Sequence, residues 1–374
     1  MTIGIDASRA FRSEKTGTEW YSWHVIRSLA EHMGSSEDNL LLYTSSPIQS
    51  NDAVFLKNEN VIVRTLAWPL KQFWTHGRLS LEMLIRPPDV LFIPAHSIPL
   101  IHPKRTIVTI HDVGFLRYPE CYSKKDLASL RFSTAYAMRH AAAIITISEF
   151  SKKEIIASYH IDPSRIHVVG LGCDQDRYYP RDANEIRHVL EKYQLSQPYI
   201  ISIGRIDARK STSSVVRCFE YMRMNGYSGA LLLVGPIGFD GNETKSLIES
   251  SPVRDHIIHA GWAPEHDKIA LLCGADAMLF LSRYEGFGLP VIEAQSCGVP
   301  VICSEAEALV EIAGGAALYC DPDDLKTCAL NVARAVSDPV LRAKLREAGF
   351  ANAKRYTWQQ TAKMTSSILR SRFP

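Results

Sequence analysis

Short apolar runs alternate along the whole chain with segments whose apolar residues recur at the helical spacing. The runs are rich in isoleucine, valine and leucine, which is typical of strands buried on both faces. Buried strands that alternate with helices predict parallel sheets covered by helices, and therefore an α/β fold. A first series comprises Ile3–Asp6, Leu40–Tyr43, Val61–Arg64, Val90–Ile93, Ile107–Ile110, Ile144–Ile147 and Ile166–Val169. A second series comprises Tyr199–Ile203, Ala230–Val234, His256–His259, Ala277–Leu281, Val299–Cys303 and Ala317–Tyr319.

The two series of predicted strands are separated by a polar, proline-containing segment, Tyr178–Asp182, which has the composition of a linker. We therefore predict two Rossmann-like domains that face each other across a cleft, residues 1–180 and residues 181–355. Ligands of such domains bind beyond the carboxyl ends of the parallel strands. The residues that directly follow each strand are thus the candidates for the site.

Composition restricts the class of protein. A hydrophobic content of 46% and a charged content of 22% are typical of a soluble globular enzyme, and a net charge of +2 gives no reason to expect nucleic-acid binding. No signal-like leader and no apolar run of about 18 residues is present, so we expect a cytoplasmic protein whose membrane contact is at most peripheral. The eight cysteines form no C-x-x-C pair and are expected to be buried thiols.

The segment Ser282–Ala294 carries two carboxylates, Glu285 and Glu293, across a glycine-bearing turn and the start of a predicted helix. Gly286 and Gly288 allow the backbone to pass close to a ligand, and the amides at the helix start can bind a polar group. A carboxylate accepts the paired hydroxyl donors of a sugar, so Glu293 can bind a ribose and Glu285 a second sugar. The alternative is that Glu285 caps a turn and that Glu293 interacts favourably with the positive end of the helix dipole.

The segment Gly204–Ser211 follows the strand Tyr199–Ile203 and has the outline of a phosphate-binding P-loop. Arg209 stands where that loop requires its second glycine, so an ATPase is excluded, and Arg209 is expected to face solvent. Two cations remain, Arg205 and Lys210, at a strand end before a helix, where a diphosphate would bind.

Other predicted strand ends carry candidate residues. His111 directly follows a strand and is expected to lie in the cleft, with the neighbouring Asp112 orienting the backbone or His111 itself. Gly17 opens a helix after the first strand, where it either brings amides to a phosphate or to the acceptor, or forms a purely structural turn. Gly235 ends the next strand of the second series, and the backbone around Gly261 and Trp262 can contact the edge of a nucleobase.

Three further motifs have a structural interpretation beside a functional one. Ser148 is predicted mainly to cap a helix, with contact to acceptor or phosphate second. Trp68 and Trp74, within Leu66–Arg78, can hold acceptor sugar rings or simply pack. The D-x-D sequence Asp174–Asp176 lies before the linker and is expected to be a surface turn, so no metal site is predicted.

The motifs resemble those of retaining glycosyltransferases of the GT-B fold, in particular family 4. The family pattern EGFGLPxxEA matches Glu285–Ala294, CGxPV matches Cys297–Val301, and the GRxxxxK pattern matches Gly204–Lys210. An HDxxFxxxPE segment matches from His111. Two departures are Gln295–Ser296, where Met and Ala are usual, and Glu19–Trp20, where the family's TGIGRY loop after the first strand has Gly and Arg, so that a positive charge is lost.

The resemblance implies a role for each matching residue. His111 would lie near the donor sugar and the reacting bond, and the loop amides after Glu285 would bind sugar hydroxyls and phosphate. The last helix, residues 356–374, would cross back to the N-terminal domain, which would bind the acceptor, while the C-terminal domain would bind the donor. The implied reacting-centre residues are His111, Arg205, Lys210 and Glu285, and the implied donor-binding residues are Gly17, Gly204, Gly235, Gly261, Trp262, Gly286, Phe287, Gly288, Leu289 and Glu293.

The resulting hypothesis is a retaining, metal-independent transfer of a hexose from a nucleoside diphosphate sugar to a hydroxyl of a glycan or lipid-linked saccharide. GDP-mannose is the expected donor, no cofactor is expected, and the reaction would take place in the cytoplasm, at the inner face of the membrane if the acceptor is lipid-linked. One alternative is a nucleotide-sugar epimerase or hydrolase on the same fold. Another is a non-catalytic nucleotide-sugar-binding protein.

Overall fold

The chain folds into two compact α/β units in a computed structural model that describes residues 1–12, 15–34, 37–48, 58–69 and 73–372. Unit 1 consists of Met1–Val113, Lys125–Gly172 and Thr357–Pro374. Unit 2 consists of Gly114–Lys124 and Cys173–Tyr356. The units therefore change over at Gly172 instead of at residue 180, and a short segment from the first half of the chain belongs to unit 2.

Unit 1 is built on a seven-stranded parallel sheet with the order β3-β2-β1-β4-β5-β6-β7. Its interior strands are buried, because helices cover both faces, and this explains why they are apolar throughout. All seven strands predicted for this part of the chain are confirmed. They are β1 (Thr2–Asp6), β2 (Asn39–Thr44), β3 (Val61–Thr65), β4 (Val90–Ile93), β5 (Thr106–Thr109), β6 (Ala143–Thr146) and β7 (Ile166–Val168).

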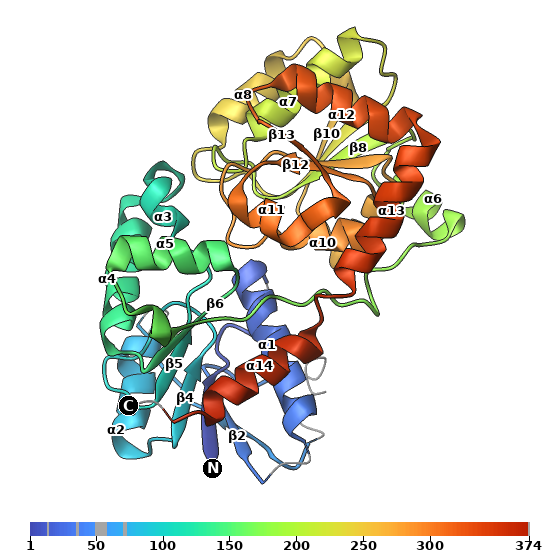
Figure 1. The fold of residues 1–374 in the computed structure, drawn as a ribbon. Helices are drawn as coiled ribbons and strands as arrows, with labels where there is room; N and C mark the ends of the chain where they lie inside the picture. The colour runs from blue at the N-terminus through green and yellow to red at the C-terminus, as the bar shows by residue number, and fades with distance from the viewer. Residues whose placement is uncertain (13–14, 35–36, 49–57, 70–72, 373–374) are drawn as a thin grey trace. The chain divides into compact units, whose positions relative to one another are not determined.

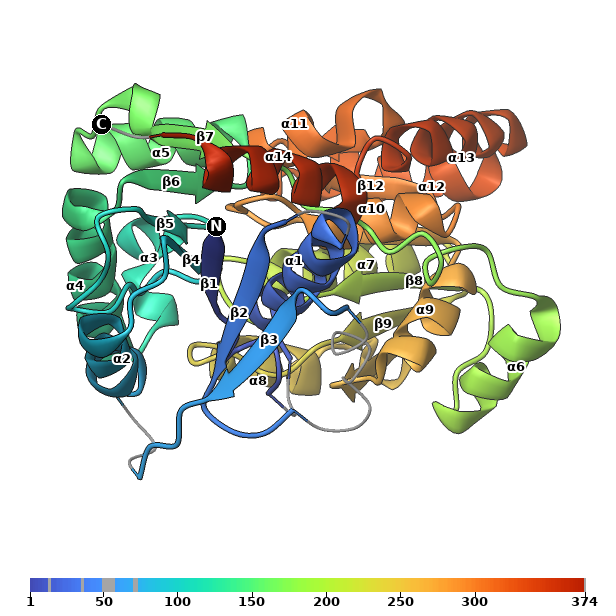
Figure 2. The same ribbon diagram turned by 90° about the horizontal axis from the view of Figure 1, so that it is seen from below.

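The final helix packs on the first helix of unit 1, as the two views in Figures 1 and 2 show. The indole of Trp358 stacks on the ring of His24 with centroids 4.7 Å apart and lies 6.2 Å from the ring of Tyr21. The helices of this unit are α1 (Gly17–Met33), α2 (Ser80–Ile85) after a π-helical turn (Thr75–Leu79), α4 (Lys124–His140), α5 (Glu149–Tyr159) and α14 (Trp358–Arg370), with a 3-10 turn at Pro163–Arg165.

Unit 2 is built on a six-stranded parallel sheet with the order β10-β9-β8-β11-β12-β13. The predicted strands are confirmed as β8 (Tyr199–Ile203), β9 (Ala230–Val234), β10 (Ile257–Gly261), β11 (Ala277–Phe280), β12 (Val301–Ser304) and β13 (Leu318–Cys320). Its helices are α3 (Gly114–Arg117), α6 (Ala183–Lys192), α7 (Thr212–Met224), α8 (Asn242–Ser250), α9 (Glu265–Cys273), α10 (Leu289–Ser296), α11 (Glu307–Ala313), α12 (Leu325–Ser337) and α13 (Pro339–Ala353). Single 3-10 turns lie at Pro119–Cys121, Arg254–His256 and Gly314–Ala316.

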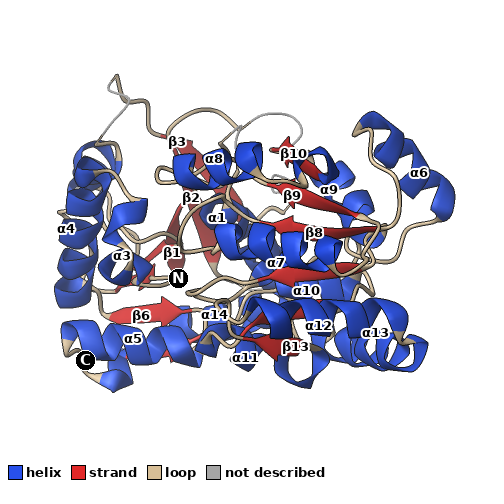
Figure 3. Cartoon of the chain, turned by 90° about the horizontal axis from the view of Figure 1, so that it is seen from above, coloured by secondary structure: helices blue, strands red, loops and turns tan. Residues whose placement is uncertain are grey.

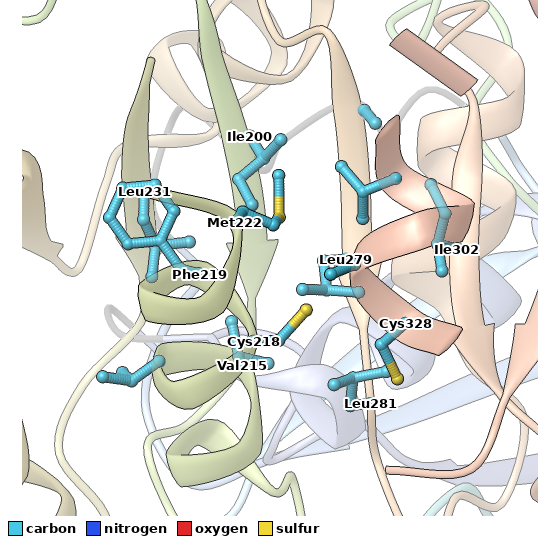
Figure 4. Close-up of a cluster of buried hydrophobic side chains, with 14 of the residues drawn as sticks. Ile200, Val215, Cys218, Phe219, Met222, Leu231, Leu279, Leu281, Ile302 and Cys328 are labelled. Atoms are coloured by element: carbon cyan, nitrogen blue, oxygen red, sulfur yellow. The ribbon is translucent and has the colours of Figure 1, made fainter. Parts of the chain in front are cut away.

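Helices lie on both sides of each sheet in Figure 3. On one face of the second sheet, α7 and α12 cover the strands with a continuous apolar core (Figure 4). Phe219 and Cys218 of α7 meet Ile200 of β8 and Leu279 of β11, and Cys328 of α12 closes the cluster. This core holds the neighbouring strands β8 and β11 in place, and the loops that follow them carry most of the candidate residues.

Each sheet has one point at which the strand order reverses. In unit 1 the neighbours at this point are β1 and β4, and in unit 2 they are β8 and β11. Loops that leave adjacent strands in opposite directions open a crevice at the carboxyl edge of the sheet, where such folds bind ligands. The loop after β8 contains Gly204–Lys210, and the loop after β11 contains Glu285.

No helix in the described part of the chain combines the length and the apolar character that crossing a bilayer requires.

Candidate active site

The switch point of unit 2 brings together Lys210 and Glu285, which are 75 residues apart in the sequence. The ammonium of Lys210 donates a hydrogen bond to Oε1 of Glu285, and the guanidinium of Arg209 lies 3.8 Å from Oε2. The two loops are also joined by their backbones, because the amide of Arg283 donates to the carbonyl of Arg209 at 2.9 Å. The sequence alone predicted that Arg209 faces solvent, and this was wrong: it turns inward because a carboxylate lies there.

Glu285 is ionised in this environment. Burial would raise the pKa of Glu285, but the charges of Lys210 and Arg209 outweigh burial and hold that pKa below its ordinary value. Lys210 and Arg209 are opposed by two buried carboxylates, those of Glu285 and of Asp207 in the same loop, so positive charge beyond this balance comes from the exposed Arg205.

The loop after β8 has a fixed shape. The buried carboxylate of Asp207 accepts a hydrogen bond from the amide of Lys210 at 2.8 Å, and Asp240 accepts from the amide of Ala208 at 3.0 Å. Arg205, by contrast, is exposed. The two predicted cations therefore differ: Lys210 is half-buried in an ion pair, and Arg205 is exposed.

Glycines allow the loops after β8, β9 and β10 to pack backbone against backbone. The amide of Gly204 donates to the carbonyl of Val234 at 2.9 Å, and the amide of Gly235 donates to the carbonyl of Gly261 at 2.7 Å. A Cβ atom on Gly235 would lie only 1.9 Å from the carbonyl oxygen of Gly204. Gly235 is therefore required for packing. Gly261 differs, because it has a positive φ of 64° and open space beside it. The adjacent Trp262 is 69% exposed.

The turn between β11 and α10 depends on Gly288, whose φ is 99° and whose added Cβ would lie 2.4 Å from the Leu309 side chain. No side chain caps the start of α10. Phe287 is buried with its ring 5.5 Å from that of Tyr356, so its side chain packs and only its backbone can serve a ligand. Gly286 is also buried, whereas Leu289 is half-buried at the first position of the helix.

Glu293 projects from α10 towards α9, where Lys268 lies 3.2 Å from both of its carboxylate oxygens. The same ammonium lies 5.1 Å from the centre of the Tyr178 ring. The sequence did not point to Lys268, because a lysine in the first turns of an amphipathic helix is usually a solvated charge. Only its position opposite Glu293 distinguishes it.

Unit 1 places His111 beside His96, with ring centroids 5.3 Å apart, and beside Tyr21 at 4.6 Å. Both ring nitrogens of His111 are buried, and neither has a hydrogen-bond partner among the described residues. Asp112 therefore does not hydrogen-bond the His111 ring, which was one of the two roles expected for it. Burial, together with His96 and Arg9, lowers the pKa of His111, so the ring is neutral and both nitrogens can bond an incoming group.

The loop before α1 is tied down by Glu19. Its carboxylate takes part in a capping box with Thr16 and lies 3.6 Å from the guanidinium groups of Arg9 and Arg12. Gly17 is the first residue of the helix, with open space where a side chain would be. The acidic departure from the family pattern thus has a structural role, because it caps the helix and binds two arginines.

The remaining motifs have local roles. Ser148 caps α5 by accepting from the amide of Ser151 at 3.0 Å, which confirms the capping prediction. Trp74 donates its indole N–H to the carbonyl of Leu66 at 2.9 Å, while residues 70–72 of the predicted acceptor segment Leu66–Arg78 lie outside the described residues. The D-x-D motif forms a turn in which the carbonyl of Asp174 accepts two backbone hydrogen bonds.

The unusual Gln295 is buried in α10 and satisfied on both sides. Its amide donates to the carbonyl of Ala316 at 3.2 Å, and its oxygen accepts from Asn352 at 2.8 Å. The hydroxyl of Ser296 lies 3.5 Å from the sulfur of Cys173. These polar replacements are tolerated because each has a partner inside unit 2.

A cavity of about 420 Å³ lies elsewhere in unit 2, at the amino edge of the sheet, and contains none of the predicted donor-binding residues. Arg181, Arg342 and Arg346 line it together with Cys273 and Cys297. The candidate site at the carboxyl edge is identified by its charged groups and glycine loops instead.

Models of known protein families together match nearly the whole chain. A family model described as "Glycosyl transferases group 1" matches residues 184–352, and one described as "Glycosyltransferase Family 4" matches residues 23–177. The O-antigen chain mannosyltransferase B of Escherichia coli is 32% identical over 264 residues, which cover 70% of this chain and 69% of that protein. The serotype-specific mannosyltransferase WbdA of Escherichia coli is 23% identical, and the match covers 90% of this chain but 45% of that longer protein.

Solved structures match the fold over its full length. Anabaena Alr3699/HepE, crystallised with UDP and glucose, has a TM-score of 0.74 at 16% identity, and 99% of each chain is covered. WaaG, a glycosyltransferase involved in lipopolysaccharide biosynthesis, has a TM-score of 0.72 at 15% identity, and both chains are covered completely. Likeness at these identities concerns the fold and not the substrate.

Proposed function

Because the chain belongs to the group 1, family 4 glycosyltransferases and has their GT-B fold, we propose that it transfers mannose from GDP-mannose to a sugar hydroxyl. The acceptor is a glycan or a lipid-linked saccharide, and the configuration at the anomeric carbon is retained. The observation that carries the proposal is the cluster of the buried Glu285 with the half-buried Arg209 and Lys210 at the switch point of unit 2.

The cluster suits the charge that the reaction develops. When the bond from the anomeric carbon to the diphosphate breaks, negative charge accumulates on the leaving phosphate and positive charge on the sugar. Lys210 and Arg209 are held in advance where that phosphate would lie, and they stabilise it without a metal ion. Glu285 accepts hydroxyl hydrogens of the donor sugar and positions the ring, and it is not assigned as a nucleophile.

The rest of the donor follows the carboxyl edge of the same sheet. Arg205 is exposed and can reach the diphosphate, while Glu293, held by Lys268, accepts the ribose hydroxyls. The exposed indole of Trp262 beside Gly261 offers a surface for the base. Mannose is chosen because relatives that match across much of this chain are named mannosyltransferases.

A donor panel tests this proposal. GDP-mannose, UDP-glucose and UDP-N-acetylglucosamine are added to the parent protein, and both the thermal shift and the release of nucleoside diphosphate are measured. Of the three donors, only GDP-mannose should raise the melting temperature of the parent, and Lys210→Ala and Glu293→Ala should each abolish this thermal shift. The matched control is Lys245→Ala, which removes a lysine from an exposed pair with Glu249 and should leave the shift unchanged.

Dependence on the acceptor separates transfer from the alternatives. Release of GDP that requires a saccharide acceptor, with an α-linked product in the proton NMR spectrum, supports retaining transfer. Release without any acceptor, or conversion of the nucleotide sugar, would support the epimerase or hydrolase. A parent protein that responds to no donor would overturn the donor site itself. For a lipid-linked acceptor the chain would work at the inner face of the membrane as a peripheral protein.

A further inference from the structure

Unit 1 exposes an apolar face formed by α2, by the loop after β4 and by α4. We call it the α2–α4 face and define it by Leu81, Leu84 and Ile85 on α2, Leu100 and Ile101 in the loop, and Phe132 on α4. Their side chains are 47%, 63%, 62%, 46%, 44% and 59% exposed in that order. A soluble surface rarely gathers so many large apolar side chains unless it binds something.

Hydrogen bonds and ring contacts show that these residues form one surface. The hydroxyl of Ser80, at the start of α2, accepts from the amides of Leu100 at 3.0 Å and Ile101 at 3.3 Å. From the other side, the hydroxyl of Tyr136 on α4 donates to the carbonyl of Leu100 at 2.9 Å. Both helices lie at the same edge of unit 1 in Figures 1 and 2.

Aromatic rings continue the face along α4. The ring of Phe132 stacks on that of Tyr136 with centroids 6.2 Å apart, and Tyr136 stacks on His140 at 4.3 Å. Rings with an apolar body and a polar edge are favoured where apolar and aqueous surroundings meet. This row suits the boundary between lipid headgroups and acyl chains.

The charges around the face are predominantly positive. The buried carboxylate of Glu82 on α2 is bound by three guanidinium groups, those of Arg64 at 3.0 Å, Arg78 at 3.1 Å and Arg86 at 2.9 Å. Three cations against one carboxylate leave two positive charges beside the exposed leucines. Exposed lysine and arginine side chains add to this excess on the loop and on α4, at Lys104, Lys124, Lys125, Arg131 and Arg139, against the exposed carboxylate of Asp126 on α4.

We propose that the α2–α4 face docks this protein onto an anionic lipid surface. Leu81, Leu84, Ile85 and Phe132 enter the boundary of the bilayer, and the surrounding arginines and lysines bind the headgroup phosphates. A second copy of the chain fits less well, because a symmetric dimer would bring two positive faces together. The inference deepens the proposed membrane contact and rests on it for the choice of partner, but its test uses neither donor nor acceptor.

Vesicle sedimentation tests the proposal. The full chain is mixed with vesicles of phosphatidylcholine alone and with vesicles that contain about one third phosphatidylglycerol, a content that gives a strongly negative surface. The parent should sediment with the anionic vesicles, and added salt should weaken this binding. Leu84→Gln/Ile85→Gln should weaken it about tenfold, since two buried apolar side chains are lost.

Matched variants separate this face from general stickiness. Met224→Gln/Val340→Gln replaces two apolar residues of unit 2 that are 71% and 78% exposed, and it should leave vesicle binding unchanged. Arg131→Glu/Arg139→Glu should remove the preference for anionic vesicles, whereas Arg217→Glu, an exposed residue of α7 in unit 2, should keep it. Far-ultraviolet circular dichroism checks that each variant is folded.

Three outcomes would overturn the proposal. The parent does not bind anionic vesicles, the Leu84→Gln/Ile85→Gln variant binds as well as the parent, or the control variant loses as much binding. Light scattering measures the molar mass of the parent and of Leu84→Gln/Ile85→Gln in solution. A parent dimer that the substitutions convert to monomers would show that the face binds a second copy of the chain instead. Normal donor binding with no vesicle binding would leave the proposed function intact and reject this inference alone.

Discussion

At the scale of single residues, the candidate site is built from two buried carboxylates, each paired with a half-buried lysine before any substrate arrives. Lys210 and Glu285 neutralise one another across two loops, and Lys268 does the same for Glu293. A buried ion pair costs desolvation, so its main energetic consequence is that removing one partner leaves the other unpaired. Substitutions in the candidate site should therefore affect stability as well as the proposed transfer.

A double-mutant cycle on the Lys210–Glu285 pair measures this effect. Lys210→Met should lower the free energy of unfolding of unit 2 by about 3 kcal/mol, because Glu285 is left buried with Arg209 alone. Lys210→Met/Glu285→Gln should be more stable than Lys210→Met, and both should lack transferase activity. Urea unfolding gives the values, with Lys245→Met as the exposed control, expected to change by less than about 1 kcal/mol. Additive effects of the two substitutions would show that the pair is not coupled.

The two histidines of unit 1 predict a dependence of stability on pH. Burial lowers the pKa of His96 to about 4, although Asp112 acts in the opposite direction, and the pKa of His111 is lowered as well. A histidine in the unfolded chain titrates near pH 6.5, so below that pH the unfolded state binds more protons. The free energy of unfolding of unit 1 should fall by more than about 2 kcal/mol between about pH 6.5 and pH 4 from His96 alone, and His111 should add to this decrease.

Urea unfolding of His96→Gln/His111→Gln at several pH values checks this assignment. The variant should show a shallower decrease below pH 6.5 than the parent and the same slope above it, because neither ring is charged there. Identical profiles in parent and variant would place the acid sensitivity in other groups.

At the scale of elements, the site depends on the loops that leave neighbouring strands. The loops after β8, β9 and β10 hydrogen-bond to one another through their backbones, and this contact is close enough to exclude a side chain at Gly235. Apolar runs and glycines in the sequence predicted the strands and the positions of the loops. They could not predict which loops touch, because the order β9-β8-β11 in the sheet is not the order in the chain.

Gly235→Ala tests the close packing of these loops. The added methyl group would overlap the carbonyl of Gly204, so the variant should be destabilised by more than about 2 kcal/mol and should bind donor weakly. Gly226→Ala is the matched control, because Gly226 also has a positive φ, 95°, but has open space beside it. Gly226→Ala should lower the free energy of unfolding by only about 1 kcal/mol, because alanine is disfavoured in this positive-φ conformation but meets no neighbouring atom. Equal losses of stability in the two variants, measured by thermal unfolding, would mean that the positive-φ backbone and not the close packing of the loops accounts for the effect of Gly235→Ala.

At the scale of the whole molecule, the chain enters each unit more than once. Unit 1 is completed by α14, which follows the whole of unit 2 in sequence, and unit 2 is joined by Gly114–Lys124 from the first half of the chain. The contact of Trp358 with His24 and Tyr21 therefore stabilises unit 1 from the far end of the sequence.

Trp358→Ala should lower the stability of unit 1 by about 3 kcal/mol, since a buried indole is removed from the surface of α1. Leu345→Ala, in the core of unit 2, should destabilise unit 2 instead. Differential scanning calorimetry resolves the two cases, and bound donor identifies the transition of unit 2 by raising it. A shift of the donor-sensitive transition by Trp358→Ala would contradict this assignment.

The sequence by itself determined the strands, the two-domain α/β architecture and the loops that carry the candidate residues. It could do so because buried parallel strands must be apolar and close backbone turns require glycine, so both leave local patterns. The tertiary structure alone decided that Arg209 turns towards Glu285, that Lys268 pairs with Glu293, and that His96 lies against His111. These contacts join residues from different loops and helices, and the sheet order that brings them together leaves no pattern along the chain.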